Sequence, residues 1–89
     1  MKFKYQISND LSEKVSKMEE FANGGTQVTI VTKDGGIYHK ILISNNKYIV
    51  AMRGCEDLPF DVADIESIYQ SDEDKNPNEK GGWKFWDEW

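Results

Sequence analysis

The chain has 89 residues, with 16 acidic against 11 basic side chains and a net charge of −5. A chain this short buries only about 60% of its unfolded surface, which suffices for one modest core and excludes a second domain. We expect one domain over residues 1–70, a loosely attached polar linker over 71–82 and an aromatic tail over 83–89. The N-terminal residues lack an apolar run typical of a signal peptide or membrane span, and the single Cys55 cannot form an internal disulfide, so a cytoplasmic protein is expected.

Charge is distributed unevenly along the chain. The part up to Arg53 carries eight bases and five acids, whereas the part from Gly54 onward carries three lysines and eleven acids. No base occurs between Glu56 and Asp74. Such a half repels phosphate backbones and favours a basic partner, although a solvated acidic rim that only aids solubility gives the same pattern.

The N-terminal quarter predicts a short strand and one helix. Residues 2–7 alternate apolar and polar side chains, which is typical of a half-buried strand. A helix of about three turns over Asp10–Ala22 is predicted next, because Asp10 and Glu13 resemble a capping box and apolar residues follow at spacings of three and four. Residues 23–25, Asn-Gly-Gly, are expected to end it.

Short strands and tight turns fill residues 27–69. Two glycines after Asp34 and the pair Asn45-Asn46 favour hairpins, and residues 62–64 are expected to form one helical turn. Alternation places Ile37, His39 and residues 41 and 43 on one side of their strand and the intervening residues on the other, so both faces are expected to be partly covered. This spacing predicts an α+β, mainly β, small antiparallel barrel. The predicted strands are QVTIVT, IYHKILIS, KYIVAMR, LPF and ESIY.

Several of these segments resemble two small families. The chain is similar to the YolD-like proteins of Firmicutes and their phages, which share a P-F element before a closing strand. It also resembles, less extensively, the Rho-binding antiterminator family, with a K-D-G hairpin and a closing D-I-x-x-I strand. This resemblance covers about half of the chain and implies an Sm-like or SH3-like barrel rather than a shared activity. The matching residues are Val28, Ile30, Lys33-Asp34-Gly35, Tyr48-Ile49-Val50, Pro59-Phe60 and Asp64-Ile65-Glu66-Ser67-Ile68.

Candidate catalytic residues are few. His39 has no serine, cysteine or carboxylate recognisably placed to work with it, and Cys55 lies beside Glu56 and Asp57, which disfavour a thiolate. Carboxylates are plentiful but form no recognisable pair, and a barrel this small leaves little volume for a pocket. We therefore expect no enzyme, no cofactor and no metal site.

The aromatic tail allows two interpretations. Four aromatic residues among the last seven would be poorly soluble if fully exposed, so something is expected to cover them. They either fold back onto the barrel and complete its core, or anchor a partner, since tryptophans dominate interface energetics. The aromatic residues are Trp83, Phe85, Trp86 and Trp89.

Two functions are compatible with this pattern. The first is a non-catalytic acidic protein-binding module, such as an immunity or inhibitor protein or a phage or mobile-element regulator, which binds a basic toxin or nucleic-acid enzyme. Its predicted contacts are the tail aromatics and the acids Glu56, Asp57, Asp61, Asp64, Asp72, Glu73 and Asp74. The alternative is an accessory protein of transcription or DNA repair that contacts nucleic acid or its enzymes. Direct nucleic-acid binding would need a local patch formed by Lys2, Lys4, Lys40, Lys47 and Arg53 with Tyr5, Tyr38 and Tyr48.

Overall fold

A very short strand and a two-turn helix open the described part of the chain. The computed structural model describes residues 4–21 and 24–86, so Lys2, Phe3 and Trp89 lie outside the described residues. Strand β1 spans Tyr5–Gln6, and helix α1 spans Asn9–Ser16.

Helix α1 differs from its prediction at both ends. Ser8, and not Asp10, is the N-cap, because its side chain accepts a hydrogen bond from the Leu11 N–H. The helix ends at Ser16, far short of position 22, which is outside the described residues. The side-chain amide of Gln70 explains part of this difference: it accepts from the Glu19 N–H at 3.0 Å and donates to the Glu19 carbonyl at 2.9 Å. The chain after α1 is thus tied to the segment that follows the last strand.

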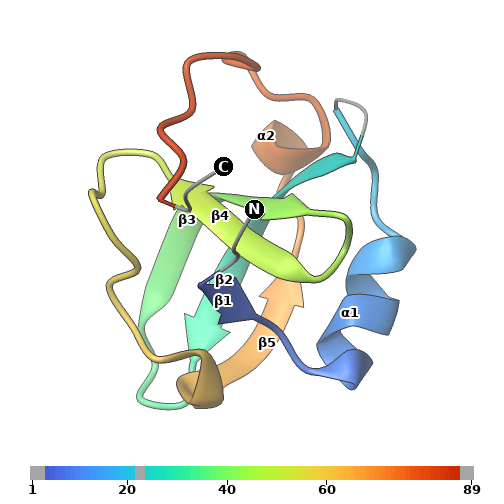
Figure 1. The fold of residues 1–89 in the computed structure, drawn as a ribbon. Coiled ribbons are helices and arrows are strands. Elements are labelled where there is room, and N and C mark those ends of the chain that lie inside the picture. Colours follow the sequence, from blue (N-terminus) through green and yellow to red (C-terminus); the bar gives the residue numbers. More distant parts are fainter. Residues whose placement is uncertain (1–3, 22–23, 87–89) are drawn as a thin grey trace.

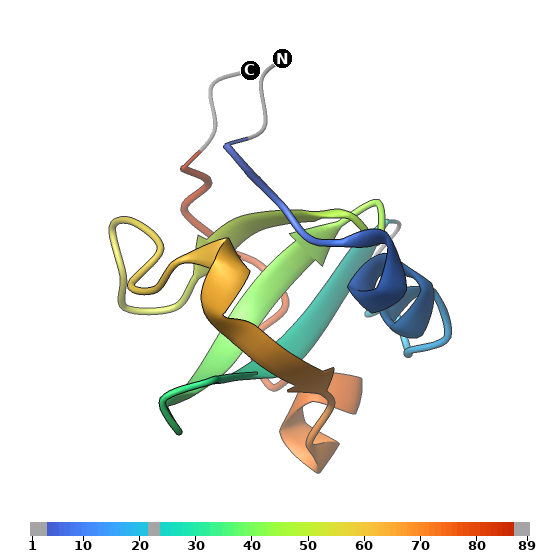
Figure 2. The same ribbon diagram turned by 90° about the horizontal axis from the view of Figure 1, so that it is seen from below.

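Five strands form one antiparallel sheet in the order β1-β4-β3-β2-β5. Strands β2 to β5 agree with four of the predicted strands to within two residues at each end. Strands β1 and β5 are the two edges and do not pair with each other, so the sheet curls into a half-barrel that stays open along one side (Figures 1 and 2). The strands that complete the sheet are β2 (Gly25–Thr32), β3 (Ile37–Ser44), β4 (Tyr48–Met52) and β5 (Ile65–Tyr69).

The two predicted hairpin turns are confirmed. Gly35 has a φ of 89°, which an L side chain adopts only with strain, and it closes the turn between β2 and β3. Asn45 and Asn46 have φ values of 54° and 63° in the turn between β3 and β4. Two consecutive residues of positive φ match the right-handed twist of the flanking strands.

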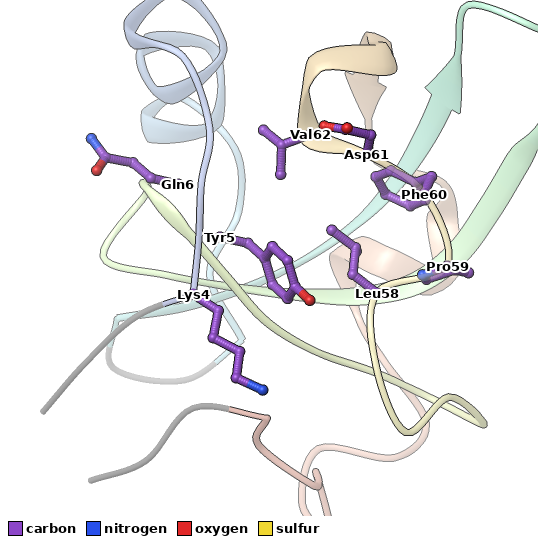
Figure 3. Close-up of a pocket in the computed structure, with 8 residues that line it drawn as sticks. All are labelled: Lys4, Tyr5, Gln6, Leu58, Pro59, Phe60, Asp61 and Val62. Atoms are coloured by element: carbon purple, nitrogen blue, oxygen red, sulfur yellow. The ribbon is translucent and has the colours of Figure 1, made fainter.

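The predicted strand at residues 58–60 is wrong. Pro59 has no N–H for a ladder, and the Leu58 N–H donates to the side chain of its neighbour Asp57 at 2.8 Å. These residues are instead a loop leading into the single helical turn η1 (Val62–Asp64), which was predicted. The loop lies across from the open edge at β1 (Figure 3).

A bulge in β3 reverses part of the predicted face assignment. Lys40 has a φ of 56°, and the register of β3 against β2 shifts at this point. The extra residue reverses which side chains of residues 37–39 face the core. Tyr38 therefore packs with Ile41 on the core side, while Ile37 and His39 are exposed. The prediction that both faces are partly covered is confirmed; the placement of Ile37 and His39 with Ile41 is wrong.

The main core lies between the sheet and α1. Val15 of the helix is fully buried, and a second, smaller cluster on the other face contains Leu42, Val50 and Ala51 with Phe21 and Trp83 against them. The buried residues of the main core are Ile7, Val15, Val28, Ile30, Ile41, Ile43, Ile49, Ile65, Ile68 and Trp86.

The segment predicted as a loose polar linker is attached to the sheet. It contains helix α2 (Asp72–Lys75), whose N-cap Ser71 and Asp74 form a capping box. The Asp74 side chain is only 1% exposed and accepts hydrogen bonds from Gln27 Nε2 and Thr29 Oγ1, both at 2.8 Å. A buried carboxylate with several donors fixes the helix against β2.

Residues 83–86 fold back onto strand β4. In β4 the register shifts so that Val50 is an extra residue relative to β3. The residue added by a bulge is left outside the ladder, and the Val50 carbonyl accepts the N–H of Trp86 at 3.0 Å. The described C-terminal residues therefore lie beside the N-terminal strand (Figure 2).

Candidate functional site

An open groove runs between β1 and the loop before β5. We call it the trough. It has two adjoining parts of about 670 and 700 Å³ that share Gln6 and Val62. One wall is formed by residues 4–9 and Leu11, the other by residues 58–63 and Ile65. Figure 3 shows Tyr5 pointing from β1 toward Leu58 in the first part. The trough occupies the side on which the half-barrel is not closed by strand pairing.

A hydrogen bond between Tyr5 and Asp57 joins the two walls. The Tyr5 hydroxyl donates to Asp57 Oδ1 at 2.6 Å, and the Leu58 N–H donates to the same oxygen. Two hydrogen bonds hold the pKa of Asp57 below its usual range: the one from Tyr5 has the larger effect and the one from the Leu58 N–H the smaller. The positive charge of Lys4 acts in the same direction. Asp57 is therefore ionised at neutral pH.

Apolar side chains anchor the loop wall to the core. Leu58, Phe60 and Val62 are partly buried against the main cluster, and the Phe60 ring lies 4.7 Å from that of Tyr38. Asp61 caps η1 by accepting the Ala63 N–H at 2.9 Å. These contacts fix the loop wall of the trough against the core.

The structure divides the predicted acids into three groups. Glu56, Asp57, Asp61 and Asp64 are exposed along the loop wall or next to it, and Glu66 follows in β5. Asp72 and Glu73 belong to α2, which lies at the opposite end of the sheet from η1 (Figures 1 and 2). Asp74 is buried under α2 and faces the sheet. Asp61 lines the trough and Asp57 is bonded to Tyr5 of the opposite wall; we call the exposed acids Glu56, Asp57, Asp61 and Asp64 the rim, and those of α2 are separate from it.

Trp86 is part of the core. Its side chain is 9% exposed, its Nε1–H donates to the Cys55 carbonyl at 3.1 Å, and its ring meets the Tyr5 ring edge-on at 5.9 Å. Phe85 is 45% exposed, and Trp89 is outside the described residues. Of the two interpretations of the tail, the folded-back arrangement is the one found for Trp86.

Arg53 holds the segment that precedes Trp86. Its Nη2 donates to the carbonyls of Gly81 at 2.7 Å and Glu79 at 3.3 Å. Its guanidinium lies 3.9 Å from the centre of the half-buried Trp83 ring, which also contacts Phe21. The planar guanidinium combines stacking with two hydrogen bonds, which a lysine does not reproduce.

Several of the basic and aromatic residues proposed for nucleic-acid contact are engaged by other parts of the chain, and Lys2 lies outside the described residues. Arg53 is engaged by the C-terminal segment, Tyr5 by Asp57 and Tyr38 by Phe60. Lys40 is in the β3 bulge, and Lys47 is in the turn before β4.

His39 and Cys55 occupy different surroundings. The exposed His39 has Nδ1 at 3.3 Å from Thr29 Oγ1, whose hydroxyl donates to Asp74, so His39 is the donor in that contact. Cys55 is half-buried and contacts the core. Within residues 4–21 and 24–86, no group of three or more histidine, cysteine or acidic side chains is arranged to hold a metal ion.

Helices in the described part of the chain are too short to cross a membrane.

The trough was not recognised from the sequence. Pro59-Phe60 lies between acidic residues in the sequence, but only the pairing of β1 with β4 places residues 4–9 across from it. That pairing joins residues more than forty positions apart, and a two-residue strand carries little periodicity to predict it.

Comparison of the chain with protein-family models, with curated proteins and with solved structures found no match.

Proposed function

We propose that this protein is a non-catalytic, acidic protein-binding module that takes up a basic surface of another protein in the trough. The observation that supports this most is the combination of apolar side chains inside the trough with acidic side chains on its rim. Apolar contacts supply affinity, and the rim attracts and orients a positively charged partner. Of the predicted contact residues, we rely here on the loop acids Glu56, Asp57, Asp61 and Asp64 and not on the tail aromatics.

The class of partner follows from charge. Five acids and no base occur in residues 56–66, so the rim favours arginine- or lysine-rich surfaces such as those of toxins or nucleic-acid enzymes. We propose an inhibitor, an immunity protein or a phage or mobile-element regulator that acts in the cytoplasm. We propose no catalytic role for His39, which contacts the Thr29 hydroxyl, or for Cys55, which is half-buried against the core.

The proposal extends to the fold family. An N-terminal helix followed by a bent antiparallel sheet with a K-D-G hairpin is compatible with an Sm-like or SH3-like barrel, and with the resemblance to the YolD-like and Rho-binding antiterminator families. Here β1 and the C-terminal residues occupy the edge of β4. Because one fold serves many functions, this assignment carries no activity with it.

A retention experiment with charge variants tests the proposed function. Asp61→Asn with Asp64→Asn removes two rim charges, and asparagine keeps the capping of η1. Asp72→Asn with Glu79→Gln is the matched control, because it removes two exposed charges away from the trough. In source-cell extract, the rim variant is expected to lose a partner that the wild type and the control retain. Equal retention by both variants would contradict the proposal.

A further inference from the structure

The backbone of Gln6 forms a free sheet edge beside the trough. Ile7 donates its N–H to the Lys47 carbonyl at 2.9 Å, so the backbone of Ile7 faces β4. Adjacent residues of an antiparallel strand direct their N–H and C=O groups to opposite sides. The N–H and C=O of Gln6 therefore face away from β4, on the side where residues 4–21 and 24–86 contribute no further strand to the sheet.

This free edge opens into the trough. Gln6 borders both parts of the trough, and in Figure 3 its side chain points away from residues 58–62. Gln6 thus presents its backbone to the trough. Strand β1 spans only Tyr5–Gln6, so Gln6 offers one backbone donor and one acceptor to an extended chain.

We propose that the trough binds an extended segment of the partner as an added strand on β1. This inference rests on the proposed function and specifies the form of the partner. Gln6 exchanges two backbone hydrogen bonds with one residue of the added strand, as in other cases of strand addition. Alternate residues of the segment are apolar and basic: the apolar ones pack on Leu58, Phe60 and Val62, and the basic ones reach Asp61 and Asp64.

A helix fits this surface less well than a strand. A helix satisfies its own backbone groups, so docking it would cover the Gln6 N–H and C=O without giving them partners. An added strand supplies a donor and an acceptor to Gln6. Successive side chains of a strand point to opposite faces. The apolar ones can therefore contact the apolar residues of the trough while the basic ones contact the acidic rim.

N-methylated peptides test strand addition without changing the protein. The probe is an acetylated and amidated peptide of seven alternating arginines and valines. Methylating the backbone nitrogens of the valines blocks one edge of the peptide, and methylating those of the arginines blocks the other. Isothermal titration is expected to show an affinity loss of about tenfold for one methylated peptide and less than about twofold for the other. Equal affinities, or equal losses, would overturn the proposal, as would failure of the unmodified peptide to bind at millimolar concentration.

A second test uses the protein edge itself. Gln6→Pro removes the outward N–H while an edge strand tolerates proline, and Gln6→Ala is the control that removes only the side chain. Gln6→Pro is expected to lower peptide affinity about tenfold and Gln6→Ala less than about twofold, with native amide spectra checked for both. Unchanged binding by a folded Gln6→Pro variant would overturn strand addition. It would leave the proposed function intact, because that function fails only if binding does not depend on Asp61 and Asp64.

Discussion

The carboxylate of Asp74 and the side-chain amide of Gln27 meet at 2.8 Å, although 47 positions separate them in the chain. Thr29 and the Ser71 N–H also donate to this carboxylate. The contact attaches α2 to β2 and makes residues 71–76 part of the domain. It also removes Asp74 from the acids that can meet a partner.

Loss of the Asp74 carboxylate is expected to destabilise the fold. Asp74→Ala removes the acceptor of the buried Gln27 amide and of the Thr29 hydroxyl, which keeps only its contact with His39, at a cost of about 3 kcal/mol. The free energy of unfolding in urea measures the change, with Asp72→Asn as a control expected to stay within about 0.5 kcal/mol. A similar small effect for Asp74→Ala would mean that α2 is not held by this carboxylate.

Trp86 is expected to contribute more stability than Phe85. Trp86→Ala removes a buried ring and its bond to the Cys55 carbonyl, so a loss of about 3 kcal/mol or more is expected. Phe85→Ala, at a half-exposed position, should cost less than about 1 kcal/mol. Urea unfolding of the two variants compares them directly. If the Trp86→Ala variant is as stable as the wild type but fails to bind its partner, then Trp86 anchors the partner and is not needed for the core.

Arg53 is expected to control the order of the segment before Trp86. Arg53→Lys keeps the charge but loses the stacking on Trp83 and the paired bonds to the carbonyls of Glu79 and Gly81, at a cost of about 1–2 kcal/mol. Amide hydrogen exchange should then accelerate in residues 79–86 and stay slow in β2 and β3. Unaltered exchange in residues 79–86 would show that other contacts hold the segment.

The Tyr5–Asp57 bond predicts a specific pH dependence. Because the pKa of Asp57 is lowered in the folded state, the bond stabilises the fold fully above the unfolded-state pKa, and this contribution is lost as the pH falls through the folded-state pKa. Tyr5→Phe should raise the pKa of Asp57 toward its usual range in a carboxyl NMR titration. Asp34 is the internal control, since Thr32 and Gly36 lower its pKa and Tyr5 is not involved. An unchanged Asp57 pKa would argue against the bond.

Sequence patterns predicted those turns and strands that are determined by residues within the same segment. Gly35 and the pair Asn45-Asn46 specify their turns through positive φ, and alternation identifies β2 and β4. The end of α1 could not be predicted this way, because Gln70 ties down Glu19 from 51 positions away. Nor could the exchange of faces at Lys40, since a bulge adds a residue without altering the composition of the strand.

The candidate site depends on contacts between distant residues. Acidity and the Pro59-Phe60 element were visible in the sequence, and they mark one wall of the trough. Its other wall follows from the pairing of β1 with β4, and the burial of Trp86 follows from the free Val50 carbonyl at a bulge. Neither the second wall of the trough nor the burial of Trp86 can be predicted from the residues of the segment in which it occurs.

In-cell photo-crosslinking tests most directly whether the trough is the binding surface. A benzoylphenylalanine replaces Pro59, on the loop wall of the trough, or Phe85, in the C-terminal segment; both positions are exposed. Irradiation is expected to join a partner protein to the probe at position 59, and adding Asp61→Asn with Asp64→Asn is expected to abolish this adduct. An adduct formed from position 85 and absent from position 59 would contradict it.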